Sequence, residues 1–126
     1  MKSILLFSLL VISQFGFSQS TSKKILVFDV VEIERKDIPY DSKDLFEFNF
    51  TNKTGQPVTI TNVQTSCGCT TANKPENPIK KNKRSKISVS YDTKRVGEFV
   101  KTITVTSDKA PAVVLTIKGN VLPQKQ

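Results

Sequence analysis

Apolar and polar residues alternate along most of the chain after residue 24, and a period of two is typical of strands with one buried face. The clearest case runs from Phe46 through Phe48 to Phe50, where Glu47 and Asn49 separate the three aromatic side chains. No stretch of about 11 residues keeps a helical period. Further strands are expected over residues 25–33, 57–64, 87–91, 99–105 and 113–121.

Breaks in this alternation predict the turns and one irregularity within a strand. Val63 does not share the parity of Val58 and Ile60, which predicts a bulge or bend near Asn62. Pro39 and the following turn-forming residues predict irregular structure over residues 36–44. Six or seven short strands with frequent turns indicate an all-β fold, an immunoglobulin-like antiparallel β-sandwich of about seven strands. A small closed barrel is the alternative that the pattern leaves open.

The N-terminus has the pattern of a secretory signal peptide. Lys2 precedes an apolar stretch, and the small residues Gly16 and Ser18 stand at the −3 and −1 positions of a cleavage site before Gln19. The apolar stretch is shorter than the roughly 20 residues that a membrane-spanning helix needs. We therefore expect a signal peptide at 1–18 and one immunoglobulin-like domain at 19–126. The protein is expected in the periplasm, at the cell surface or secreted, and not to span the membrane.

Composition excludes several kinds of chemistry. The chain contains no histidine, so serine–histidine and cysteine–histidine catalysis and histidine-based zinc sites are ruled out. No pattern of paired carboxylates or cofactor motif replaces them, and we expect neither enzymatic activity nor a cofactor. The formal net charge of +8 is compatible with an anionic partner, although export argues against nucleic acid.

The tripeptide Cys67-Gly68-Cys69 is the most distinctive chemical feature of the sequence, and several interpretations of it stay open. In an extended segment the two Cα atoms would lie about 6.6 Å apart, near the limit for a disulfide, and glycine could bring them closer. The pair could instead bind a soft metal ion such as Cu(I), exchange disulfides, or bond to another chain. It could also be a packed strand end, where cysteine acts as a small apolar residue.

A basic run follows between two expected strands. It contains five cations, Lys80, Lys81, Lys83, Arg84 and Lys86. Such a run could contact an anionic surface, although a solvated turn is the interpretation that the sequence favours. No aromatic residue is interleaved with these cations, so the run offers no platform on which nucleic-acid bases could stack.

The order of these features is similar to that of a known bacterial family. Ser66-Cys67-Gly68-Cys69-Thr70 is the most specific part, and it is accompanied by characteristic residues at 48–55, 57–63, 78–79, 87–91 and 97–105. Over residues 25–122 the chain resembles the family catalogued as domain of unknown function 1573, which is common in exported proteins of Bacteroidota. The resemblance implies an immunoglobulin-like fold akin to domains of the sperm-protein and hydin type, and no established activity. Members commonly carry a Pro-Gly turn where this chain has its basic run.

Together these observations predict an exported, non-catalytic binding or structural module of the cell envelope. Its partner would be a protein or an envelope polymer, bound by sheet edges and loops. The alternative is a thiol-based function, either soft-metal binding or redox exchange, through Cys67 and Cys69.

Overall fold

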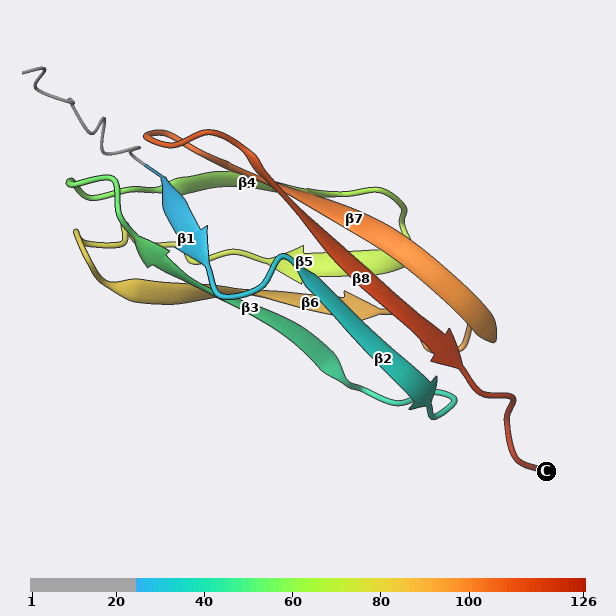
Figure 1. Ribbon diagram of the computed structural model, residues 1–126. Helices are drawn as coiled ribbons and strands as arrows, with labels where there is room; N and C mark the ends of the chain where they lie inside the picture. The colour runs from blue at the N-terminus through green and yellow to red at the C-terminus, as the bar shows by residue number, and fades with distance from the viewer. Residues whose placement is uncertain (1–24) are drawn as a thin grey trace, which may run out of the picture.

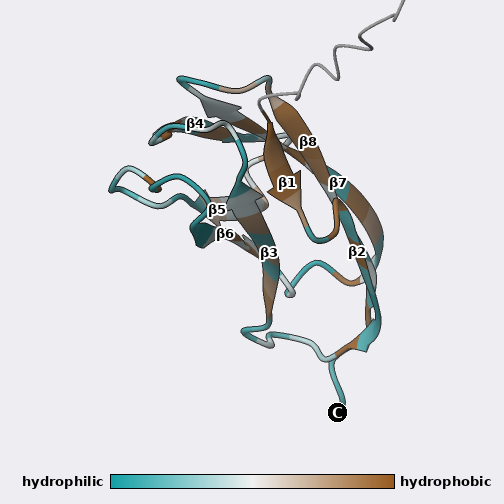
Figure 2. Cartoon of the chain, turned by 60° about the vertical axis from the view of Figure 1, so that its left-hand side comes forward, coloured by the Kyte–Doolittle hydropathy of each residue, from teal (hydrophilic) through white to brown (hydrophobic). Residues whose placement is uncertain are grey.

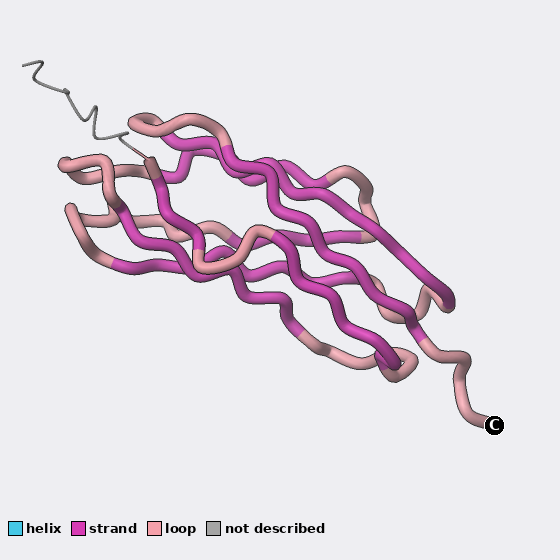
Figure 3. Tube along the Cα trace, in the orientation of Figure 1, coloured by secondary structure: helices cyan, strands magenta, loops and turns pink. Residues whose placement is uncertain are grey.

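A computed structural model describes residues 25–126, and the predicted signal peptide lies outside these residues. The described chain forms a two-layer sandwich in which strands are joined by loops, with no helix in this part of the chain (Figures 1 and 3). The strands are β1 (Leu26–Phe28), β2 (Glu32–Ile38), β3 (Leu45–Asn52), β4 (Ile60–Thr65), β5 (Thr70–Asn73), β6 (Arg84–Tyr91), β7 (Gly97–Ser107) and β8 (Val113–Val121). The prediction of an all-β sandwich is confirmed, with eight strands in place of about seven.

The two sheets contain four strands each. One has the order β1-β3-β6-β5 and the other the order β2-β8-β7-β4. All neighbouring strands are antiparallel except β2 and β8, which pair in parallel from Glu32 opposite Thr116. The sandwich is thus antiparallel, as expected, except at this one edge.

The parallel pair arises because the first expected strand is in fact two strands. The amide of Asp29 donates to the carbonyl of Asn49 in the first sheet, at 3.0 Å. Two residues later the carbonyl of Val31 accepts from the amide of Thr116 in the second sheet, at 2.8 Å. The chain thus changes sheets at Val30, and β2 then continues to Ile38, into the segment that was expected to be irregular.

The core lies between the inner faces of the sheets, where the apolar residues of the alternating pattern meet (Figure 2). Phe46, Phe48 and Phe50 are at most 1% exposed, which confirms that the phenylalanine row faces inward. Phe46 lies edge-on to Phe99 of the opposite sheet, with ring centroids 6.3 Å apart. These rings provide much of the apolar area that stabilises the sandwich.

Loops gather at the two ends of the sandwich. One end carries the loops between β3 and β4, between β5 and β6, and between β7 and β8 (Figure 1). The connections from β2 to β3, from β4 to β5 and from β6 to β7 lie toward the other end, as does the C-terminus. The cysteine pair therefore lies in a loop toward the second end, whereas the basic run begins in a loop at the first end and continues into β6.

Candidate functional site

The sandwich has four edge strands, and they differ in how well they are protected against pairing with another chain. Five of the seven residues of β2 are charged, which discourages an added strand. β1 has only three residues, and β5 has four and is followed at once by Lys74 and Pro75. β4 contains neither a charged residue nor a proline. Among the described residues, β4 is thus the least protected edge.

The hydrogen bonds of β4 show which of its backbone groups point away from the sheet. The amide of Ser66, just after the strand, donates to the carbonyl of Thr102 in β7 at 3.0 Å. Because backbone groups alternate in direction along a strand, Gln64 also faces β7, and Val63 and Thr65 direct their N–H and C=O groups outward. The pairing register shifts between Ile60 and Asn62, which confirms the bulge predicted there. The regular part of the open edge is therefore Asn62–Thr65.

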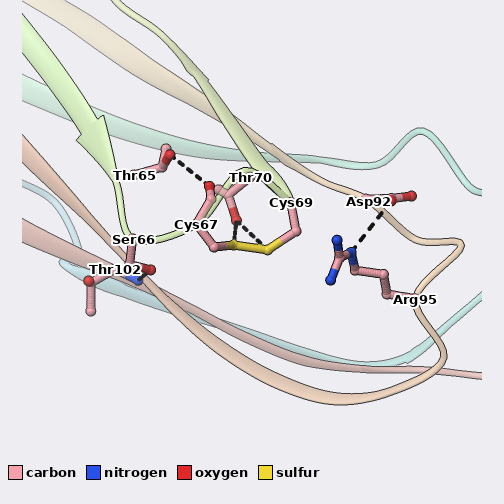
Figure 4. Close-up of a disulfide and its surroundings, with 8 residues drawn as sticks. All are labelled: Thr65, Ser66, Cys67, Cys69, Thr70, Asp92, Arg95 and Thr102. Atoms are coloured by element: carbon pink, nitrogen blue, oxygen red, sulfur yellow. Dashed lines mark hydrogen bonds and ion pairs between the residues drawn. A yellow bond between two sulfur atoms is a disulfide. The ribbon is translucent and has the colours of Figure 1, made fainter.

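The cysteine pair lies directly after this edge, in the connection that crosses from β4 in one sheet to β5 in the other (Figure 4). In the structure Cys67 and Cys69 are joined by a disulfide, with their Cα atoms 5.3 Å apart. Cys69 is buried, at 7% exposure, whereas Cys67 is half-buried and Gly68 is exposed. The bond closes a ring of three residues at the crossing.

The role expected for Gly68 needs a correction. The sequence suggested that glycine would shorten the span between the cysteines through dihedral angles closed to other residues. Gly68 does not have a positive φ, and a Cβ added there would meet no atom within 4 Å. Neither the backbone conformation nor the available space at the crossing therefore requires glycine.

Hydrogen bonds connect the disulfide ring to three neighbouring elements. At the end of β4, the hydroxyl of Thr65 donates to the carbonyl of Cys67 at 3.0 Å (Figure 4). In β5, the hydroxyl oxygen of Thr70 lies 3.6 Å from the sulfur of Cys67 and 3.8 Å from that of Cys69. On the turn after β6, the amide of Asp92 donates to the carbonyl of Cys69 at 2.8 Å. The crossing is thus a rigid corner at the C-terminal end of the open edge.

This arrangement limits the chemistry that the sulfur atoms could perform. With both sulfurs in the bond, neither is a thiolate that could bind a metal ion, and residues 25–126 contain no group of three or more potential ligands. Exchange with an external thiolate would be easiest at Cys67, the more exposed partner. Arg95, the cation drawn beside the disulfide in Figure 4, pairs with Asp92 at 3.6 Å. Metal binding and redox exchange stay predictions.

The structure divides the basic run into two groups. Arg84 donates two hydrogen bonds to the carboxylate of Asp29, at 3.1 and 2.5 Å, and Lys86 donates to Glu47 at 2.9 Å. The hydrogen bonds from Arg84 lower the pKa of Asp29, and those same bonds raise the pKa of the guanidinium. These two cations lie in β6. Lys80, Lys81 and Lys83 lie exposed in the preceding loop.

Asn52 connects the loops at the end of the sandwich where the basic run begins, and little in the sequence points to this role. Its side chain is completely buried. Its amide nitrogen donates to the carbonyls of Gln56, at 2.7 Å, and Ile79, at 2.9 Å. Its amide oxygen accepts from the backbone N–H and the hydroxyl of Thr54, at 3.0 and 2.7 Å. The Asn-x-Thr spacing at 52–54 is the only local signal of this network, and it equally matches a glycosylation pattern.

The topology and the core define an immunoglobulin-like β-sandwich, and comparison with solved structures agrees with this fold. The PapD-like domain 7 of human CEP192 has a TM-score of 0.68 at 6% identity, covering 83% of this chain and 89% of that one. A protein of unknown function from Porphyromonas gingivalis W83 has a TM-score of 0.63 at 15% identity and 83% coverage of this chain. The YadV chaperone has a TM-score of 0.54 at 18% identity, covering 79% of this chain and 52% of that one.

The sequence itself assigns the family. Residues 26–121 match the family described as protein of unknown function DUF1573, and the chain belongs to that family. No curated protein matches the chain in sequence. The chain spans about half the length of the Porphyromonas gingivalis protein, 51% of it. Among residues 25–126 there is no helix long and apolar enough to cross a membrane.

Proposed function

We propose that the protein is an exported, non-catalytic binding module of the cell envelope, which binds an extended segment of a partner protein along β4. The observation that carries this proposal is the open edge of β4, whose regular part is Asn62–Thr65. This strand lacks the charges of β2 and the lysine and proline that follow β5. An extended segment that pairs with such an edge gains main-chain hydrogen bonds and continues the sheet.

The chemistry of the edge indicates what kind of segment it would accept. Val63 and Thr65 each offer one N–H and one C=O group, so a partner of about four residues could form four hydrogen bonds. The exposed side chains of Asn62 and Gln64 beside them are polar and uncharged. Such an edge repels neither acidic nor basic segments, and its specificity would come from alternate side chains of the partner.

The disulfide contributes rigidity to the proposed site. Binding costs less free energy when the receptor is ordered beforehand, because less conformational entropy is lost on association. The ring of Cys67 and Cys69, the bond from Thr65 and the bond from Asp92 fix the C-terminal end of β4. The cysteine pair therefore acts in this proposal as a structural pin for the binding edge. The likeness to PapD-like and chaperone structures supports the fold on which this rests.

A proline scan of two edges tests the proposal. Peptides would first be selected from a display library of random seven-residue sequences on the immobilised protein, and their affinities measured by calorimetry. Val63→Pro removes an outward N–H, and proline is tolerated at such edge positions. The matched control is Ala72→Pro on the edge strand β5. The amide of Asp92 donates to the carbonyl of Cys69, so the backbone groups of Cys69 face β6. Because these groups alternate in direction along the strand, the N–H of Ala72 points outward, as that of Val63 does.

The expected result is loss of peptide binding in Val63→Pro, with wild-type affinity in Ala72→Pro and cooperative unfolding in both. Peptide binding that survives Val63→Pro would contradict the proposal. So would equal losses in the two variants, or a library that yields no peptide for the native protein.

A further inference from the structure

Five exposed lysines from three different loops lie at one end of the sandwich, which we call the basic end. They are Lys53 in the loop after β3, Lys80, Lys81 and Lys83 in the loop before β6, and Lys109 in the loop after β7. Only three of them belong to the run that the sequence singles out. Figure 1 shows the three loops side by side at the end from which β1 starts.

Backbone contacts hold these loops against one another. The amide of Asn52 donates to the carbonyl of Lys83, and the amide of Asn82 donates back to the carbonyl of Asn52, both at 2.9 Å. Val58 and Ile79 exchange two hydrogen bonds, at 2.9 and 2.7 Å, in an isolated bridge. These bonds and the buried side chain of Asn52 give the lysines of the first two loops a fixed framework.

The third loop joins this framework through Asp108. Its amide donates to the carbonyl of Thr59 at 3.1 Å, and its carboxylate accepts from the amide of Thr59 at 2.9 Å. The carboxylate is therefore occupied by a backbone donor. Glu76 is the other carboxylate of the three loops. The three loops also contain Lys74, directly after β5, so six lysines against these two acids give them a net charge of +4.

The lysines of the basic end are free to meet an external anion. The ion pairs within residues 25–126 use other cations, Arg84, Lys86, Arg95 and Lys118. Carboxylates lie within 4.0 Å of those four cations, and none lies so close to a lysine of the basic end in the described part of the chain. A shallow groove in this region is lined by residues 75–80 and 83–85, which include the carboxylate Glu76 as well as Lys80, Lys83 and Arg84.

We propose that the basic end binds an acidic polysaccharide, through carboxylate groups spaced along its chain. A lysine ammonium group is a compact charge, whereas the planar guanidinium of arginine presents paired N–H donors that match one oriented phosphate. Lysines therefore suit the spaced carboxylates of a flexible polymer better than a single phosphate group. Protein segments that bind a membrane surface combine basic side chains with large apolar side chains. None of the exposed large apolar residues of the described chain lies within the three loops that carry these lysines. A soluble linear polyanion is therefore the partner that fits.

Two triple variants of equal charge test this inference independently of the β4 edge. The basic-end variant combines Lys80→Gln, Lys81→Gln and Lys83→Gln. The control combines Lys36→Gln, Lys43→Gln and Lys94→Gln, three exposed lysines toward the other end that take part in none of the ion pairs above. Both variants lower the net charge by three. Binding to polygalacturonate, to neutral dextran and to vesicles containing phosphatidylglycerol would be measured at low and high salt.

Native protein should bind polygalacturonate at low salt and not dextran. The basic-end variant should bind about tenfold more weakly, since each exposed charge contact changes the affinity roughly two- to threefold. Its binding should also depend less on salt, and the control should bind like the native protein. Equal losses in the two variants would overturn the proposal, because net charge alone would then explain binding. Binding to vesicles alone, or to neither anionic probe, would overturn it as well.

Discussion

Reduction of the Cys67–Cys69 disulfide should weaken the fold only modestly, because the bond closes a ring of three residues. In the chain-entropy account, a loop of three residues loses about 5.4 cal/mol/K on cross-linking, or about 1.6 kcal/mol at 25 °C. The hydrogen bonds from Thr65 and Asp92 to the cysteine carbonyls do not depend on the sulfurs and should persist. Reduced Cys69 can stay buried as a small apolar side chain.

Urea unfolding of the native protein, with and without a phosphine reductant, measures this effect. With a slope of about 1.5 kcal/mol/M, typical of a domain of this size, the midpoint should fall by about 1 M. The double variant Cys67→Ala with Cys69→Ala is the control, and reductant should not move its midpoint. A loss of more than about 4 kcal/mol would refute the reasoning, because a three-residue ring cannot supply it. No loss at all would show that the ring does not constrain the unfolded chain.

Four substitutions test other parts of the structure by chemical or thermal unfolding. Asn52→Ala should cost about 3 kcal/mol, because it removes four hydrogen bonds and leaves buried polar groups unpaired; a cost under 1 kcal/mol would contradict the network. Gly119→Ala should cost about 1–3 kcal/mol, because the new Cβ would lie within 2.8 Å of three atoms, one of them backbone. Gly68→Ala should change stability by no more than about 1 kcal/mol and should leave the disulfide intact. Asp29→Asn tests the ion pair with Arg84, which lowers the pKa of Asp29 in the folded protein. The stabilisation by this pair is therefore fully present above the unfolded pKa near 3.8, and it is lost as the pH falls through the lower folded pKa. The stability difference between native protein and Asp29→Asn should therefore shrink below about pH 4, and a difference that grows there would contradict the assignment.

Strict alternation was sufficient to predict the strands whose two faces differ in solvent exposure. Phe46, Phe48 and Phe50 alternate with exposed residues in β3, so the pattern and the burial coincide. The same reasoning located the bulge near Asn62, because a residue that changes parity must interrupt the ladder. These are local properties of the chain, and a local pattern can show them.

Pairing partners are not local, and there the sequence was insufficient. The segment 25–33 is mostly apolar, interrupted only by Asp29 and Glu32, which is compatible with one strand and equally with two edge strands in different sheets. Its division at Val30 depends on bonds to Asn49 and Thr116, which are far away in the sequence. The parallel pairing of β2 with β8 follows from that division.

The candidate sites could be predicted only in part for the same reason. The cysteine pair and the basic run are visible as residues, but the openness of β4 depends on which strands border it. Lys53 and Lys109 join the basic end only because Asn52 and Asp108 connect separate loops. The engagement of Arg84 likewise requires Asp29, 55 positions earlier in the chain.

Amide hydrogen exchange at β4, with and without a bound peptide, tests the central claim most directly. In the free protein the amides of Val63 and Thr65 should exchange rapidly and that of Gln64 slowly, since only Gln64 is directed toward β7. Peptide binding should protect Val63 and Thr65 and leave the edge amides of β5 unchanged. If the peptide binds while the amides of Val63 and Thr65 still exchange at their free rates, the β4 edge is not the binding site.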